Sequence, residues 1–199
     1  MAGIPYTFRV GALLLLAGVM VLHDRLYRQG RGGRVWEYGF LFLTGILGAL
    51  YGAANDAVTS GMSPEYFTAG KGLSETGPLR QQAVVLGAQA GFSAGAIACA
   101  IWQFVLRRMP ARERCLLILR HIWVPFVLAL SLAVLFPLVC GHADPLRFAV
   151  RLDGTLSAAD RPGFLTVWWV HLGTYSGLTA GMGAGIYMTK KHNHSQQVF

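Results

Sequence analysis

Hydrophobic residues fall into five long runs along the chain, and polar and charged residues gather between them. Each run is long enough for a membrane-spanning α-helix, which needs about 20 mostly apolar residues to cross a hydrocarbon core of about 30 Å. The pattern therefore predicts an all-α integral membrane bundle of five transmembrane helices in a single domain, residues 1–199. We expect the spans at residues 6–22, 36–54, 82–106, 116–139 and 163–188.

The polar segments between the runs predict loops at residues 55–81 and 140–162, and a polar tail at residues 189–199. In the first loop, Ser63-Pro64 has the chemistry of a helix N-cap followed by a first-turn proline. We therefore expect a short interfacial helix beginning at Glu65-Tyr66-Phe67, with its aromatic rings in the lipid headgroups. The first span has the length of a signal-peptide core, but basic residues follow it instead of preceding it, so we interpret it as a retained helix.

Composition and charge give the bundle an orientation. Of the 199 residues, 54% are hydrophobic and 13% are charged, whereas soluble domains have about 25% charged residues. The net charge of +8 lies on one side of the predicted bundle, which carries Arg25, Arg28, Arg31, Arg34, Arg107, Arg108, Arg112, Arg114, Arg120, Lys190 and Lys191. Because cytoplasmic loops are enriched in Lys and Arg, we expect the N-terminus outside, the C-terminus in the cytoplasm and both long loops on the outer face. This placement explains the basic charge without nucleic acid and fits a bacterial cytoplasmic membrane.

Glycines recur at four-residue spacing in three of the spans, which places them on one face of each helix. They are Gly48 and Gly52, then Gly87, Gly91 and Gly95, then Gly173, Gly177, Gly181 and Gly185. Small residues allow two helix backbones to approach closely in a membrane. We expect the stripes of the third and fifth spans to cross one another within the chain. The alternatives are association with a second copy or another membrane subunit, and a pore lined by glycines and hydroxyls.

A candidate site on the outer face includes Asp56, Thr59, Glu65, Tyr66, His142 and His171. Imidazole and carboxylate groups together suit zinc, copper or iron, or a proton relay. An ionisable group within a span is also a functional-site hypothesis by default. The alternative is that His171 hydrogen-bonds a neighbouring helix, while the acids are solvated or paired with Lys71 and Arg80. A single haem held by His121 and His171 is not expected, because the two lie near opposite ends of their spans.

The run Asp56-x-x-Thr59-x-x-x-Ser63-Pro64-Glu65-Tyr66-Phe67 resembles a motif of a family of uncharacterised bacterial multi-pass membrane proteins. The resemblance covers about a dozen residues after an apolar span, and it implies membrane residence and a shared outer-loop feature. That family often has a histidine directly before the aspartate, where this chain has Asn55, and the difference argues against a metal role. The resemblance brings no activity with it.

The sequence contains no nucleophile elbow, phosphate loop or HExxH motif, so it does not indicate an enzyme and requires no cofactor. Packing residues without reaction machinery favour a structural or accessory subunit of a larger membrane complex. One alternative is a small channel or transporter with Asp56 and Glu65 at its outer mouth. The other is a redox component that binds a metal or haem, with His142 and His171 as candidate ligands.

Overall fold

A computed structural model describes residues 33–74, 76–141, 143–144 and 156–196, together with Gly11, Leu15, Gly18, Val19, Leu22, His23 and Leu26. All regular structure in this part of the chain is helical. The elements are α2 (Gly33–Met62), the π-helix η1 (Tyr66–Gly70), α3 (Leu79–Val105), α4 (Ala111–His121), α5 (Trp123–Cys140) and α6 (Arg161–Gln196). Most of the predicted first span, most of the predicted loop at 140–162 and His142 lie outside the described residues.

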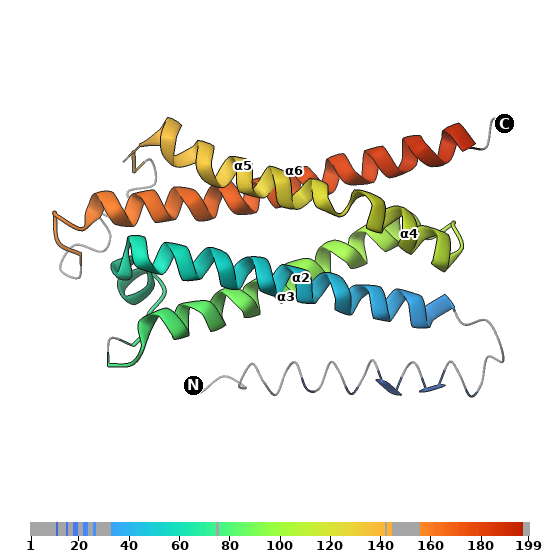
Figure 1. Ribbon diagram of the computed structural model, residues 1–199, viewed down its shortest axis with the longest axis horizontal. Helices are drawn as coiled ribbons and strands as arrows, with labels where there is room; N and C mark the ends of the chain where they lie inside the picture. The colour runs from blue at the N-terminus through green and yellow to red at the C-terminus, as the bar shows by residue number, and fades with distance from the viewer. Residues whose placement is uncertain are drawn as a thin grey trace.

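The helices form two antiparallel hairpins that lie side by side (Figure 1). One hairpin pairs α2 with α3, and the other pairs α5 with α6; contacts are dense within each hairpin and sparse between them. The end of α2, η1, the end of α5 and the start of α6 share one end of the molecule, here called the η1 end. The opposite end, which holds α4 and the C-terminus, is called the α4 end. The predicted loops at residues 55–81 and 140–162 were expected on one face. The helices that flank these two segments do end and begin at the same end of the molecule, the η1 end.

Two of the helices extend beyond the predicted spans. Helix α2 does not stop at residue 54 but continues to Met62, so Asn55, Asp56 and Thr59 are helical instead of lying in a loop. Polar side chains do not end a helix when neighbouring groups supply their hydrogen-bond partners. The helix ends before Ser63 because the residue that precedes a proline is disfavoured in the helical conformation. Helix α6 likewise continues through much of the predicted tail, to Gln196.

The predicted fourth span is divided into α4 and α5, with Ile122 between them. Pro125 explains the break, because proline has no N–H for the carbonyl four residues earlier, that of His121, and its ring clashes there. Pro137, by contrast, lies inside α5. The break at Ile122 thus lies three residues before the first of these two prolines.

Three stretches are long and apolar enough to cross a membrane: Val35–Met62, Leu79–Val105 and Ala111–Cys140. Their outward surfaces carry large apolar side chains, with Phe104 65% exposed and Leu138 76% exposed. Extended exposed apolar surface of this kind marks contact with a membrane or a partner. The described part of the chain is thus compatible with a membrane protein that crosses the bilayer at least through these three stretches.

Glycines bring α2 and α3 into backbone contact. A Cβ added to Gly48 would collide with the carbonyl oxygen of Gly91, and one added to Gly52 would collide with that of Gly87. Gly95 faces the backbone of Thr44 in the same way. The glycine stripe of α3 therefore faces α2, and the backbones of these two helices are in direct contact.

The expectation that the third-span and fifth-span stripes cross one another is wrong for most of their length. Added Cβ atoms on Gly173, Gly177 and Gly181 of α6 would collide with Leu132, Leu128 with Ala129, and Pro125 of α5. Only Gly185 faces α3, through the ring of Trp102. Each stripe therefore packs mainly within its own hairpin, against a helix that is near it in the chain.

Candidate functional site

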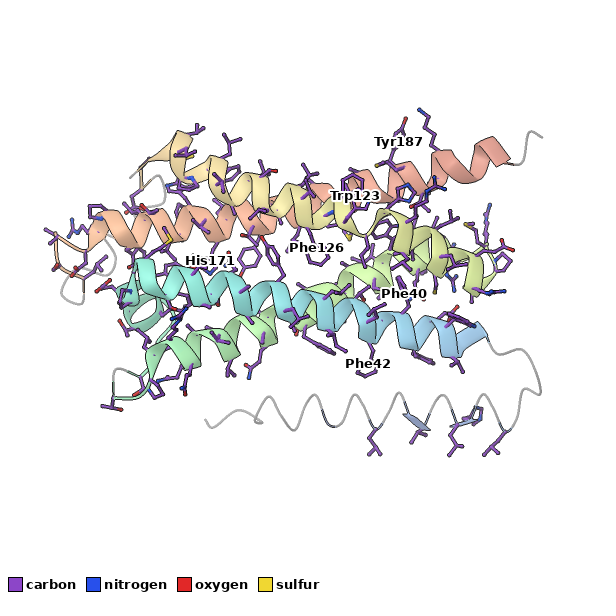
Figure 2. The ribbon with its side chains drawn as sticks, viewed as in Figure 1. Phe40, Phe42, Trp123, Phe126, His171 and Tyr187 are labelled. Carbon is purple, nitrogen blue, oxygen red and sulfur yellow. The ribbon has the colours of Figure 1, made fainter. Side chains whose placement is uncertain are left out.

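Asp56 and His171 join the two hairpins near the η1 end. His171 Nε2 lies 3.0 Å from Asp56 Oδ1, and both residues are buried, at 4% and 7% exposure. Figure 2 shows His171 on α6 facing α2, the helix that carries Asp56. The alternative interpretation, that His171 hydrogen-bonds a neighbouring helix, is confirmed, but Asp56 is its partner instead of being solvated or paired with Lys71 or Arg80.

The polar atoms of the pair have further hydrogen-bond partners. His171 Nδ1 lies 2.9 Å from the carbonyl oxygen of Val167, which can only accept, so Nδ1 is the donor in this bond. Asn55 Nδ2 donates at 3.1 Å to Asp56 Oδ1, the same oxygen that lies 3.0 Å from His171 Nε2. These bonds hold the imidazole and the carboxylate in place from both sides.

Aromatic rings surround the imidazole. Tyr66 stacks on His171 with ring centroids 4.8 Å apart, Phe67 presents its edge at 6.1 Å, and Tyr175 lies at 6.4 Å. Burial raises the pKa of Tyr66 above its ordinary value, and Tyr175 and Asp56 add to the rise. Tyr66 is thus a neutral phenol at any physiological pH. The aromatic rings therefore enclose the imidazole, and His171 and Tyr66 are both buried from solvent.

The turn between α2 and α3 places these rings. The backbone N–H of Tyr66 donates to Ser63 Oγ at 3.3 Å, so Ser63 caps the helical turn as predicted. The expectation that Tyr66 and Phe67 enter the headgroups is wrong, because they are 4% and 0% exposed and pack against Phe164 and its neighbours on α6. The π-helical turn rotates the rings inward, toward the core.

The structure brings three of the predicted site residues together: Asp56, Tyr66 and His171. Glu65 instead accepts a hydrogen bond from Ser63 Oγ at 3.0 Å, and Thr59 donates to the carbonyl oxygen of Asn55 at 2.9 Å. His142 lies outside the described residues. Lys71 lies over the Tyr66 ring, with Nζ 5.4 Å from its centroid.

Sequence reasoning missed two contributors to this site. Asn55 supplies a donor to the carboxylate, although the helix was expected to have ended before it. Gly87 of α3 makes room, since a Cβ there would lie 2.7 Å from Asp56 Cγ. The four-residue spacing between Gly87 and Gly91 predicted close helix packing. It did not show that the group packed against Gly87 is the carboxylate of Asp56.

The metal hypothesis gains no support from the described residues, which contain no group of three or more His, Cys, Asp or Glu side chains placed to hold an ion. His121, the other buried histidine among the described residues, belongs to the α4 end. Its Nδ1 lies 3.0 Å from the carbonyl oxygen of Leu117 and 3.5 Å from Thr189 Oγ1 of α6.

A cavity of about 340 Å³, partly open to the outer surface of the helices, lies between the hairpins. Its walls include the aromatic side chains Tyr51, Trp102, Phe126 and Tyr175, and no charged side chain lines it. Phe126 of α5 reaches into the space beside α2 (Figure 2), where its ring centroid is 5.6 Å from that of Tyr51. Ligand pockets typically have volumes of about 300–1,000 Å³ and mostly apolar walls, so this cavity has the size and lining of a binding site.

A second polar contact, at the α4 end, joins α2 to α4, the helix that precedes α5. The guanidinium of Arg114, which is 4% exposed, pairs with the carboxylate of Glu37 on α2. Gln103 Nε2 of α3 donates to the backbone carbonyl of Glu37 at 3.0 Å. The apolar cavity therefore lies between two polar contacts, the buried Asp56–His171 pair at one end and the partly exposed Glu37–Arg114 pair at the other.

Comparisons with known proteins found no matching family model, and no significantly similar curated protein or solved structure.

Proposed function

We propose that this chain is an integral membrane protein that binds a small lipid-soluble molecule between its two hairpins. The observation that carries the proposal is the cavity of about 340 Å³, whose walls are apolar and aromatic and contain no charged side chain. A charged or strongly hydrated molecule would lose its hydration there without compensation. An apolar molecule that is already dissolved in the bilayer has no such hydration to lose.

The sparse contact between the hairpins supports the proposal. Within each hairpin the glycine contacts fix the backbones closely, whereas the hairpins meet mainly through the two polar contacts and the buried clusters at each end. Entry of a ligand then requires only that the hairpins separate slightly. The Asp56–His171 and Glu37–Arg114 contacts restore the closed arrangement.

The other interpretations of the sequence have less support. Most of the glycine stripes are occupied by intramolecular contacts, so association with another membrane subunit stays a prediction that needs a different surface. A path for ions would need polar walls along its length, whereas this cavity is apolar and buried clusters lie toward both ends. The binding role remains compatible with a place in a larger complex.

Filling the cavity is expected to abolish binding of an apolar probe. Ala98 lines the cavity, whereas Ala100, on the same helix, is exposed and does not. We expect Ala98→Phe to weaken naphthalene binding at least about tenfold and Ala100→Phe to leave it unchanged, because only the first ring occupies the ligand's volume. Equilibrium dialysis against nanodiscs, with empty nanodiscs subtracted, measures this. The proposal is contradicted if the wild-type protein shows no saturable binding, or if the two variants bind naphthalene equally.

The five-span arrangement, with the N-terminus outside and the C-terminus in the cytoplasm, is part of the proposal. Helix α5 lies beside α6 over most of the length of α5, so a bilayer crossed by α5 would also be crossed by α6 (Figure 1). The basic residues of the α4 end, among them Arg107, Arg108 and Arg112, favour the cytoplasmic side.

Cysteine labelling tests this orientation. In a variant without the three native cysteines, we expect Thr76→Cys to react with an impermeant maleimide in intact cells. Lys190→Cys is expected to react only after the membrane is permeabilised. Both positions are exposed, so accessibility reports the side of the membrane. The reverse labelling pattern would show that the bundle has the opposite orientation in the membrane.

A further inference from the structure

We propose that the cavity holds one hydrocarbon chain of an anionic phospholipid, and that Arg107 and Lys190 bind the headgroup of that lipid at the α4 end. The inference rests on the proposed function and names the chemical class of the ligand at the same site. Only the chain enters the apolar cavity, and the charged headgroup stays outside it, at the membrane surface.

The cavity opens between α3 and α6. Four of the residues that line it are exposed, Ile97 and Ile101 of α3 and Tyr175 and Thr179 of α6, and the other described lining residues are buried or half-buried. Residues four apart lie on one face of a helix, so each pair forms one rim of the opening. Ile97 and Ile101 lie within the apolar stretch Leu79–Val105. In a bilayer, the opening therefore faces lipid chains instead of water.

The cavity is long and narrow. Its wall on α3 extends from Gly91 to Trp102, which is about 16 Å along the helix axis at about 1.5 Å per residue. A volume of about 340 Å³ over that length has a mean cross-section of about 20 Å². Carbon atoms in contact lie about 4 Å apart, so this section admits one alkyl chain and not two side by side. The opening and the shape together indicate a single lipid chain.

The rim on α3 leads to Arg107. Phe104 follows Ile97 by seven residues and Ile101 by three, so it continues the same exposed face of the helix toward the α4 end. The guanidinium carbon of Arg107 lies 4.4 Å from the centre of the Phe104 ring, and Nη1 donates to the carbonyl oxygen of Phe104 at 3.4 Å. These contacts hold an exposed cation where the rim ends.

The rim on α6 leads to Lys190. This exposed lysine follows Thr179 by eleven residues, which is about three turns and returns to the same face of the helix. The ring of Trp102 on α3 lies against Gly185 of α6, and Arg107 and Lys190 each come five residues after that contact. The two cations therefore lie at a similar depth, one beside each rim of the opening.

The headgroup, and not the chain, makes the site selective. A chain that moves from the bilayer into an apolar cavity exchanges one hydrocarbon environment for another, so it gains no hydrophobic free energy. An anionic headgroup does gain, because each Lys or Arg near the membrane surface contributes about a fivefold preference. Arg107 and Lys190 together should favour an anionic over a zwitterionic phospholipid with the same chains by roughly 25-fold.

Naphthalene displacement tests the lipid class in the wild-type protein. We expect saturable naphthalene binding in phosphatidylcholine nanodiscs, and a dissociation constant at least about tenfold higher in phosphatidylglycerol nanodiscs with the same chains, because the held chain occupies the cavity. In Arg107→Gln/Lys190→Gln the two constants should become nearly equal. Arg112→Gln/Arg120→Gln is the matched control, since it removes the same charge from exposed positions on α4. There the tenfold difference should persist.

Glycerol phosphate distinguishes a lipid from a free phosphate ligand. It carries the charge without a chain, so adding it to phosphatidylcholine nanodiscs should leave naphthalene binding unchanged. Weakened binding would show that the phosphate alone closes the cavity, and the inference would be wrong.

Fluorescence quenching tests where the chain lies. Trp102 lines the cavity and is 3% exposed. In a variant with Trp102 as its only tryptophan, phosphatidylglycerol with brominated chains should quench it saturably, and brominated phosphatidylcholine at the same low mole fraction should quench it far less. Ala98→Phe, which fills the cavity, should abolish this difference, whereas Ala100→Phe should keep it. Equal quenching by both lipids would place the chain outside the cavity and overturn the inference.

The displacement measurement uses the wild-type protein, so it decides the question even if the single-tryptophan variant does not fold. Equal naphthalene affinity in the two lipids overturns the inference while leaving the cavity a binding site. A difference that survives in Arg107→Gln/Lys190→Gln, or that is lost equally in the α4 control, also overturns it. Absence of saturable binding in phosphatidylcholine nanodiscs overturns the proposed function itself.

Discussion

Replacing His171 with phenylalanine is expected to lower the free energy of unfolding by about 3–5 kcal/mol. The substitution leaves the Asp56 carboxylate buried at 7% exposure, with the amide of Asn55 as its remaining side-chain donor. A buried charge without its partner costs more than the pair itself contributes, because it has lost hydration and received little in exchange. Titration with SDS in mixed micelles, followed by circular dichroism, measures the loss.

Asp56→Asn is expected to cost much less, about 1 kcal/mol. An amide at this position carries no charge, and its NH₂ group can donate to His171 Nε2 while Nδ1 keeps its bond to Val167. Adding Asp56→Asn to His171→Phe should then restore stability relative to His171→Phe alone. This rescue separates loss of a charge partner from loss of packing, since a packing defect would remain in the double variant.

Glu113→Gln serves as the control for charge removal, because Glu113 is exposed on α4 at the far end of the molecule. Surface substitutions of this kind usually change stability by less than about 0.5 kcal/mol. If Asp56→Asn proves as damaging as His171→Phe, a buried carboxylate without its partner does not explain the instability of His171→Phe.

The helices could be predicted from the sequence because their signal is local. Apolar runs and four-residue glycine spacing identified the helices, and Ser63-Pro64 identified a cap that the structure has. The partner of each glycine stripe could not be predicted in the same way. Gly91 and Gly177 have similar neighbours in sequence, and only the fold shows that one meets Gly48 and the other Ala129.

The candidate site was harder to predict because its residues come from three separate elements. Asp56 and His171 were selected as ionisable groups near one face, and the structure joins them across more than a hundred residues. Glu65 shared the same sequence features, yet it bonds to Ser63. The cavity leaves no local signal, since Trp102 and Phe126 look like ordinary apolar helix residues until the space between the hairpins is known.

Two glycines on α6, two residues apart, are expected to respond to alanine with opposite signs. A Cβ at Gly181 would collide with the backbone of Pro125 and Val124, which cannot shift as a flexible side chain can. We expect Gly181→Ala to destabilise the protein by about 1–3 kcal/mol. Gly183 has no atom within 4 Å of an added Cβ, so Gly183→Ala should be neutral or stabilising by about 0.5–1 kcal/mol through helix propensity.

The same contrast should recur on the other hairpin, where Gly52 meets Gly87 and Gly39 meets nothing within 4 Å. Both pairs are measured by SDS titration, and naphthalene binding is measured in parallel. Because Gly181 and Gly52 fix distances within a hairpin and the cavity lies between hairpins, the folded fraction of each variant should still bind the probe. If alanine has equal effects at Gly181 and Gly183, backbone contact between α5 and α6 does not hold that hairpin together. The description of the cavity as a space between two rigid hairpins would then be wrong.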